Sequence, residues 1–258
     1  MRNKNILITG VTSGLGRELA IYLVKKGNAV FGVARRENIL KDLSKELNTP
    51  NFKYLNFDLS KKGSWEKVTQ ALKQGSFILD VVIFNAAKIQ DKTSKDLDSK
   101  VLRDFFELNF FSILNGVEVI SKLGKKTHFI AISTSSAFKG SALEHIGYPS
   151  SKAALSNIFE SLYLRYKKTD FAYTTIFLGP INKGSNPYQK SFFNINLNKA
   201  LKIVHQAIEK KKPIYYYPKS YFFILFLIKL LPIQIYFRLL SIAEKLHHKG
   251  EIVIFQNK

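Results

Sequence analysis

The sequence contains no cysteine, which excludes disulfide bonds and thiolate metal sites. It also lacks a long hydrophobic run near its start. The first ten residues, MRNKNILITG, have no apolar core of a secretory signal and lead directly into a strand pattern, so we expect a cytoplasmic protein. The five histidines show no metal-ligand spacing, so we expect no metal site.

Acidic residues are scarce, because 19 Asp and Glu stand against 40 Lys and Arg, a net charge of +21. Such an excess suits nucleic acid or an anionic membrane surface. A general bias of composition explains it equally well, since Lys, Asn, Ile, Phe and Tyr are abundant together. The longest basic run is 210–212, and aromatic and basic residues do not interleave as in an RNA-binding motif, so we expect no nucleic-acid partner.

Short apolar or β-branched runs alternate with segments of helical periodicity over most of the chain. The pattern predicts helices at 14–26, 61–74, 99–121, 147–168 and 197–211, and strands at 4–9, 28–34, 53–57, 77–84, 127–133, 171–178 and 213–217. This alternation predicts an α/β fold: a doubly wound, Rossmann-type parallel sheet of about seven strands with helices on both faces. We predict one domain over 1–218.

Residues 219–258 differ in character and are predicted to be an apolar, basic, helical extension of this domain. The uninterrupted apolar stretch from Tyr221 to Ile228 is too short to cross a bilayer, which takes about 20 residues. Two helices broken near Pro232 are expected. We expect 219–240 to dock on the inner face of a membrane as a peripheral contact, or to build an apolar entrance for a lipophilic substrate. The alternative is that these helices cover the substrate cleft or lie in a subunit interface.

A glycine-rich turn, TGVTSGLG, follows the first predicted strand and precedes a helix. Gly10 permits a tight turn, while Gly14 and Gly16 let the backbone approach a pyrophosphate. The N-terminus of the helix then offers free N–H groups and a partial positive charge to the phosphates. This context favours a dinucleotide site over a turn that holds no ligand.

The second predicted strand ends without an acidic residue. Ala34 occupies the position at which an acid would bind the ribose hydroxyls of the adenosine, and Arg35 and Arg36 follow it. Two guanidinium groups suit the 2′-phosphate of NADP, which we therefore predict as the cofactor. The alternative is two solvated arginines at the start of a helix.

Tyr148 and Lys152 are four residues apart and share one face of a predicted helix. A nearby cation favours the phenolate and lowers the pKa of a tyrosine from its usual value near ~10. Such a tyrosine can exchange a proton with a carbonyl oxygen or an alcohol. Alone, the pair is usually a surface coincidence, but its place after the fifth predicted strand, behind the glycine turn, indicates an active site.

Together these motifs resemble the short-chain dehydrogenase/reductase family over residues 4–217. The resemblance implies that Tyr148 donates the proton and that Lys152 lowers its pKa and holds the nicotinamide ribose. It also implies a catalytic serine at Ser135, which would bind the carbonyl oxygen, and a catalytic Asn109 that anchors a water chain to Lys152. Thr134 and Ser136 are the alternatives for the serine, because a one-residue change in the loop would shift the alignment.

The resemblance further implies a cofactor-binding set. Its members are Gly10, Ser13, Gly14, Leu15, Gly16, Arg35, Arg36, Asp58, Leu59, Asn85, Ala86, Tyr148, Lys152 and Ile181. Two positions depart from the family pattern: Ala87 replaces a glycine, and Lys183 stands where a threonine would orient the nicotinamide carboxamide.

We expect an NADP(H)-dependent oxidoreductase that interconverts a carbonyl and an alcohol on a small-molecule substrate, and a homo-oligomer, dimer or tetramer. The alternatives are a non-catalytic NADP-binding regulatory protein and a membrane-associated protein that keeps the fold. Retention of Asn109, Ser135, Tyr148 and Lys152 favours the enzyme.

Overall fold

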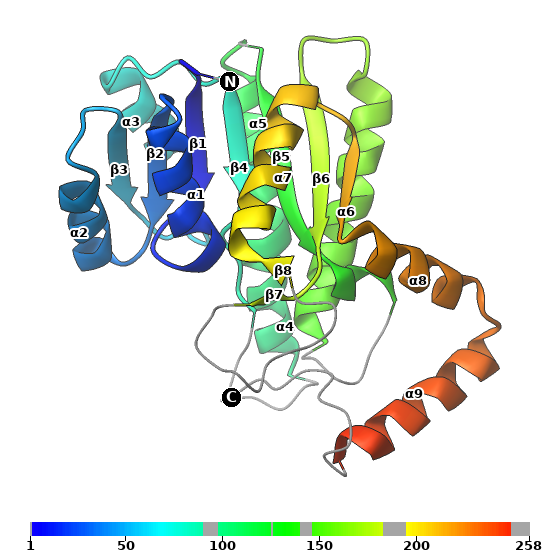
Figure 1. Ribbon diagram of the computed structural model, residues 1–258. Coiled ribbons are helices and arrows are strands. Elements are labelled where there is room, and N and C mark those ends of the chain that lie inside the picture. The colour runs from blue at the N-terminus through cyan, green and yellow to red at the C-terminus, as the bar shows by residue number, and fades with distance from the viewer. Residues whose placement is uncertain (1, 90–97, 125, 140–145, 183–194, 249–258) are drawn as a thin grey trace.

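A parallel sheet of seven strands forms the centre of the molecule (Figure 1). The computed structural model describes residues 2–89, 98–124, 126–139, 146–182 and 195–248, with side chains to residue 242. The strand order is β3-β2-β1-β4-β5-β6-β9, which confirms the predicted doubly wound α/β fold. The strands are β1 (Asn5–Thr9), β2 (Ala29–Ala34), β3 (Phe52–Asn56), β4 (Val81–Phe84), β5 (His128–Thr134), β6 (Ala172–Leu178) and β9 (Ile214–Tyr217).

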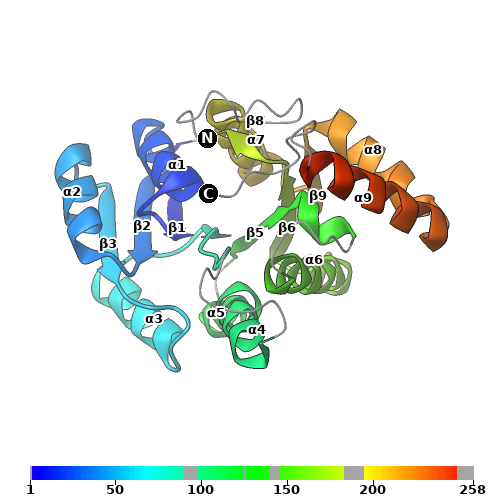
Figure 2. The same ribbon diagram turned by 90° about the horizontal axis from the view of Figure 1, so that it is seen from below.

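Helices cover both faces of this sheet (Figure 2). One face carries α1 (Gly14–Lys25), α2 (Glu37–Leu47) and α7 (Leu197–Lys210); the other carries α3 (Ser64–Gln74), α4 (Ser99–Phe106), α5 (Ser112–Ser121) and α6 (Gly147–Tyr166). Successive strand residues serve the two cores in turn, so Ile6 and Ile8 pack on the α1 side and Leu7 on the α3 side. Strands buried on both faces need apolar residues at every position, which explains the near-continuous apolar runs.

Several boundaries differ from the sequence prediction. The fourth strand begins at Val81 rather than at 77, because the Asp80 carboxylate accepts hydrogen bonds from Asn5 N and from Lys4 Nζ, both at 2.9 Å. The predicted helix 99–121 contains a π-helical turn, η1 (Glu107–Phe111), between α4 and α5. Helix α2 and the short pair β7 (Ile181–Asn182) and β8 (Ile195–Asn196) are elements outside the predicted ranges.

The order of the strands places the ligand crevice. Chain connections run outward in opposite directions from the neighbouring strands β1 and β4. In sheets of this kind, ligands bind beyond the carboxyl ends of the strands at such a switch point. Figure 2 looks onto that edge of the sheet, where β1, β4 and β5 end.

The C-terminal region forms two helices, α8 (Lys219–Leu230) and α9 (Ile233–His248), separated at Pro232 as predicted. They project from the end of the sheet that carries β9 (Figures 1 and 2). The ring of Phe222 packs at 5.3 Å from that of Phe138 and at 5.2 Å from that of Tyr216. Within the described part of the chain, no helix has the length and apolar character needed to span a bilayer.

Candidate active site

The glycine turn between β1 and α1 adopts a conformation that depends on its glycines. Gly10 has φ +77°, and its N–H donates to Val33 O at 2.7 Å. A Cβ on Gly16 would lie 2.2 Å from Gly10 O, so only glycine lets the helix start this close to the turn. By contrast, a Cβ on Gly14 would meet no protein atom within 4 Å, so the start of α1 is open at the position where a pyrophosphate would approach it.

Asn85 ties the end of β4 to this turn. Its backbone N–H donates to Thr9 Oγ1 at 3.0 Å, and its Nδ2 donates to Thr9 O at 3.0 Å and to Gly10 O at 3.2 Å. The N–H of Ala86 also donates to Thr9 Oγ1, at 3.0 Å. The side chain of Asn85 thus holds the switch point together, which is a structural task beside the predicted cofactor contact.

The two arginines after β2 point to different partners. Arg36 Nη2 donates to Thr12 Oγ1 at 2.9 Å and to Ser13 Oγ at 2.8 Å, so its guanidinium lies against the glycine turn. The side chain of Arg35 is 67% exposed, and its Nη1 lies 3.7 Å from Asp58 Oδ2. Positive charge is therefore concentrated where the adenosine half of a dinucleotide would lie.

Asp58 and Leu59, two neighbours in the predicted cofactor-binding set, differ in burial: Asp58 is half-buried and Leu59 is buried. Asp58 Oδ1 accepts hydrogen bonds from Ser60 N at 3.0 Å and Ser60 Oγ at 2.8 Å. Burial raises the pKa of Asp58, but the Ser60 hydrogen bonds and the charges of Arg35 and Lys61 outweigh burial and lower that pKa overall. Leu59 is buried in the core beside Trp65, so its side chain serves packing.

Lys152 is buried at the inner side of α6. Its Nζ donates to Ile132 O at 2.8 Å, and burial lowers the pKa of the ammonium from 10.5 to about 8. Tyr148 lies one helical turn earlier and is partly exposed. The helix is fixed to β5 by the hydrogen bond between Ser133 Oγ and Ser156 Oγ at 2.8 Å.

Ser135 begins the short 3₁₀ helix η2 (Ser135–Phe138) directly after β5 and is buried. Helix α6 packs against both β5 and η2, so the elements that carry Ser135, Tyr148 and Lys152 meet at the carboxyl end of β5. The alternatives for the serine, Thr134 and Ser136, share a hydrogen bond at 3.3 Å between their hydroxyls. Ser135 is the buried member of the three, and it stays the predicted serine of the site.

Asn109 lies within the π-helical turn and is fully buried. Its Oδ1 accepts from Lys88 N at 2.8 Å, while its Nδ2 donates to Lys88 O at 2.9 Å and to Ser151 Oγ at 3.0 Å. Ser151 Oγ in turn donates to Tyr148 O at 2.9 Å. The sequence reasoning missed Ser151, although it stands between the tyrosine and the lysine of the motif.

The residues predicted to lie near the nicotinamide are only partly among the described residues. Ile181 lies in β7, paired with Ile195 of β8, and is half-buried against the core that α1 and α7 cover. Leu15 packs on the same core, whereas Ser13 and Gly14 lie at the start of α1. Lys183, the residue expected in place of a threonine, lies outside the described residues.

Comparison with known proteins gives consistent matches. A family model described as short chain dehydrogenase matches residues 4–209. An uncharacterized oxidoreductase of Myxococcus xanthus is 30% identical over 184 residues, which span 69% of this chain and 72% of that protein. An NADPH-dependent pterin aldehyde reductase of Arabidopsis thaliana is 33% identical over 103 residues, 37% of this chain and 43% of that protein. In three further relatives, from Dictyostelium discoideum and Saccharomyces cerevisiae, the match spans 54 to 64% of the relative's length.

The fold has a close counterpart among solved structures. A short-chain dehydrogenase/reductase of unknown function from Caenorhabditis elegans, determined with cofactor, superposes with a TM-score of 0.72 at 16% identity. The match covers 85% of this chain and 96% of that one. At this identity, the likeness shows the shared fold.

Proposed function

Because this chain belongs to the short chain dehydrogenase family, a family of oxidoreductases, we propose that it interconverts a carbonyl and an alcohol with NADP(H). The observation that carries this proposal is the placement of Tyr148 one turn before the buried ammonium of Lys152, at the carboxyl end of β5. A phenol beside a cation, at the edge of the sheet that faces the dinucleotide turn, is suited to proton exchange with a substrate oxygen.

Each side chain of the site has a separate task in this scheme. Tyr148 donates its phenolic proton to the carbonyl oxygen during reduction and takes it back during oxidation. Ser135 donates a hydrogen bond to the same oxygen as negative charge develops on it. Lys152, held at Ile132 O, keeps a positive charge near the tyrosine and so lowers the cost of forming the phenolate. Asn109 fixes the backbone beneath them through Ser151.

The glycine turn fits a dinucleotide, because it leads into the N-terminus of α1, whose free N–H groups suit phosphates, and a Cβ at Gly14 would meet no protein atom within 4 Å. When bound, a reduced nicotinamide supplies the hydride that the carbonyl carbon accepts. We propose NADP rather than NAD, since Arg36 lies on Thr12 and Ser13, Arg35 is exposed beside it, and no acid ends β2. The NADPH-dependent relative agrees with this choice.

We propose a small-molecule carbonyl compound as the substrate and a homodimer or homotetramer as the working form, since members of the family commonly form oligomers. The direct test follows NADPH consumption with a panel of ketones, aldehydes and 3-ketoacyl or sterol-like compounds. We expect at least one member to be reduced, and the lipophilic members to be the better substrates if α8 and α9 form an apolar entrance. NADPH binding without turnover on any member would favour a non-catalytic role.

A further inference from the structure

The solvent-facing side of α8 consists of large apolar side chains. Five of them are between 42 and 66% exposed: Phe223, Ile224, Phe226, Leu227 and Leu230. Their spacing of one, three, four and seven residues places them on a single face of the helix. A helix exposed to water usually carries polar residues there, so this face is typical of an interface.

Helix α9 extends this character along the chain. Another five apolar side chains are between 46 and 57% exposed on it: Ile233, Ile235, Phe237, Leu239 and Ile242. We call the five residues of α8 the apolar face. The five of α9 lie on both flanks of the buried Tyr236, because their spacing of two, four, six and nine residues turns them to different sides of the helix. The two helices thus hold ten of the sixteen large hydrophobic side chains that are exposed within the described residues, and the other six are spread over the rest of the molecule. The exposure is therefore a local feature of the two helices.

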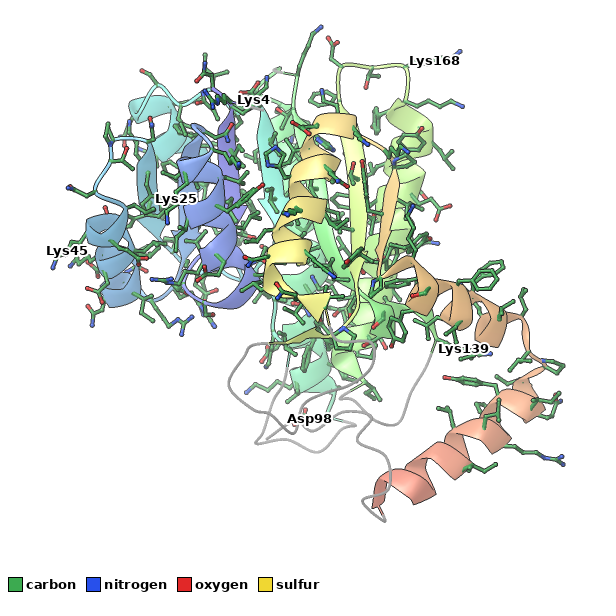
Figure 3. All side chains as sticks on the ribbon, in the orientation of Figure 1. Lys4, Lys25, Lys45, Asp98, Lys139 and Lys168 are labelled. Carbon is green, nitrogen blue, oxygen red and sulfur yellow. The ribbon has the colours of Figure 1, made fainter. Side chains whose placement is uncertain are left out.

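Other side chains of the two helices hold them on the domain. Phe222 is buried, with its ring 5.3 Å from that of Phe138 and 6.1 Å from that of Phe177. Tyr236 is buried as well, and Lys139 Nζ lies 3.9 Å from the centre of its ring. Figure 3 labels Lys139 beside α8, and its Nζ also donates to Ile228 O at 3.4 Å. Residues outside the apolar face thus make the contacts between the two helices and the domain.

The charges of α8 and α9 are mostly positive. The two helices hold Lys219, Lys229, Arg238 and Lys245 against one acidic residue, Glu244. Lys219 and Arg238 are exposed, while Lys229 Nζ lies 5.7 Å from the centre of the Phe138 ring. A symmetric interface between two copies would bring an excess of cations together with one carboxylate from each copy of this segment to pair them, which is unfavourable. An anionic lipid surface offers both an apolar layer and the opposite charge.

We propose that α8 and α9 dock the protein on the surface of an anionic lipid bilayer. The apolar face enters the boundary between headgroups and acyl chains, and Lys219 and Arg238 lie at the level of the lipid phosphates. Since no described helix could span a bilayer, the contact is peripheral. The proposal is independent of the proposed catalytic function.

Flotation of the full-length protein with vesicles tests this proposal. We expect it to rise with vesicles of phosphatidylcholine and phosphatidylglycerol at low ionic strength. We expect much weaker flotation with phosphatidylcholine alone, or in about 1 M salt, where the Debye length falls to about 3 Å.

Two variants separate the apolar and ionic contributions. Replacing Phe223, Phe226 and Leu230 together by serine should lower the partition coefficient at least about tenfold. The pair Lys219→Gln and Arg238→Gln should lower it about fivefold per cation. The matched control replaces Ile78 and Leu164, both 58% exposed and both away from α8 and α9, by serine; it should float like the parent. All these side chains are exposed, so the fold should survive, and circular dichroism checks that it does.

Three results would overturn the proposal. The parent protein could remain at the bottom of the gradient with anionic vesicles at low salt. The triple serine variant could float as well as the parent does. The parent could also fail to float while light scattering shows an oligomer that the control variant keeps and the triple serine variant loses. A second copy of the protein would then cover the apolar face.

Discussion

Asn109 and Ser151 are joined by a buried hydrogen bond of 3.0 Å, from the asparagine Nδ2 to the serine Oγ. Because Ser151 Oγ also donates to Tyr148 O at 2.9 Å, the π-helical turn is connected to the first turn of α6. The connection reaches the backbone of Tyr148 rather than its phenol. Ser151 is thus a positioning residue in the proposed site.

Ser151→Ala should lower the free energy of unfolding by about 1–2 kcal/mol, because it removes one buried and one partly buried hydrogen bond. It should also lower kcat while leaving the affinity for NADPH unchanged. The neighbouring Ser150→Ala is the control: this hydroxyl is exposed and donates only to Ile146 O, so a change of less than about 0.5 kcal/mol is expected. Urea denaturation and steady-state kinetics measure both; equal effects of the two variants would contradict the positioning role.

Arg36→Ala should weaken NADPH binding by about tenfold or more, because it removes charge-assisted hydrogen bonds to the 2′-phosphate. NADH lacks that phosphate, so its affinity should change by less than about twofold. Arg103→Ala, at an exposed position on α4, should change neither. Fluorescence titration with both cofactors measures this. Equal affinity of the parent protein for NADPH and NADH would show the cofactor assignment to be wrong.

Lys152 should make stability depend on pH. Burial lowers its pKa from 10.5 to about 8, so between these two values the unfolded chain binds more protons than the folded protein does. The free energy of unfolding should therefore rise with pH in this window, by about 2 kcal/mol from about pH 7.5 to about pH 9.5.

Denaturation curves at the two pH values, for the parent and for Lys152→Met, isolate this contribution. The variant should lose the rise, while Lys199→Met, at an exposed position on α7, should keep it. A rise of the same size in Lys152→Met would mean that other groups cause it.

The sheet was predictable because its strands are buried on both faces, and this forces apolar residues into short continuous runs. The start of the fourth strand was not predictable. Phe77 and Leu79 continue the apolar pattern, but Asp80 accepts hydrogen bonds from Lys4 and Asn5. The π-helical turn at Asn109 was also missed. The turn is held by the hydrogen bonds of Asn109 to Lys88 and Ser151, which the local sequence does not show, so a continuous helix was the natural prediction.

Within the site, the residues with a distinctive backbone or spacing were the easiest to place. Gly16 and Lys152 lie where the motif puts them, at the tight turn and at the inner side of α6. Ser151 and the core position of Leu59 depend on tertiary packing, which the local sequence does not encode. The tail shows the same limit: its composition predicted two apolar helices, but only the structure shows that Phe222 faces inward and Phe223 outward.

The most direct test of the central claim is turnover by Tyr148→Phe on a substrate that the parent protein reduces. The substitution removes only the proton-donating hydroxyl, so NADPH affinity should be retained while kcat falls by ~10²–10⁴. Tyr166→Phe, on the outer end of the same helix, should keep the activity of the parent. Activity of Tyr148→Phe close to that of the parent would contradict the assignment of the active site.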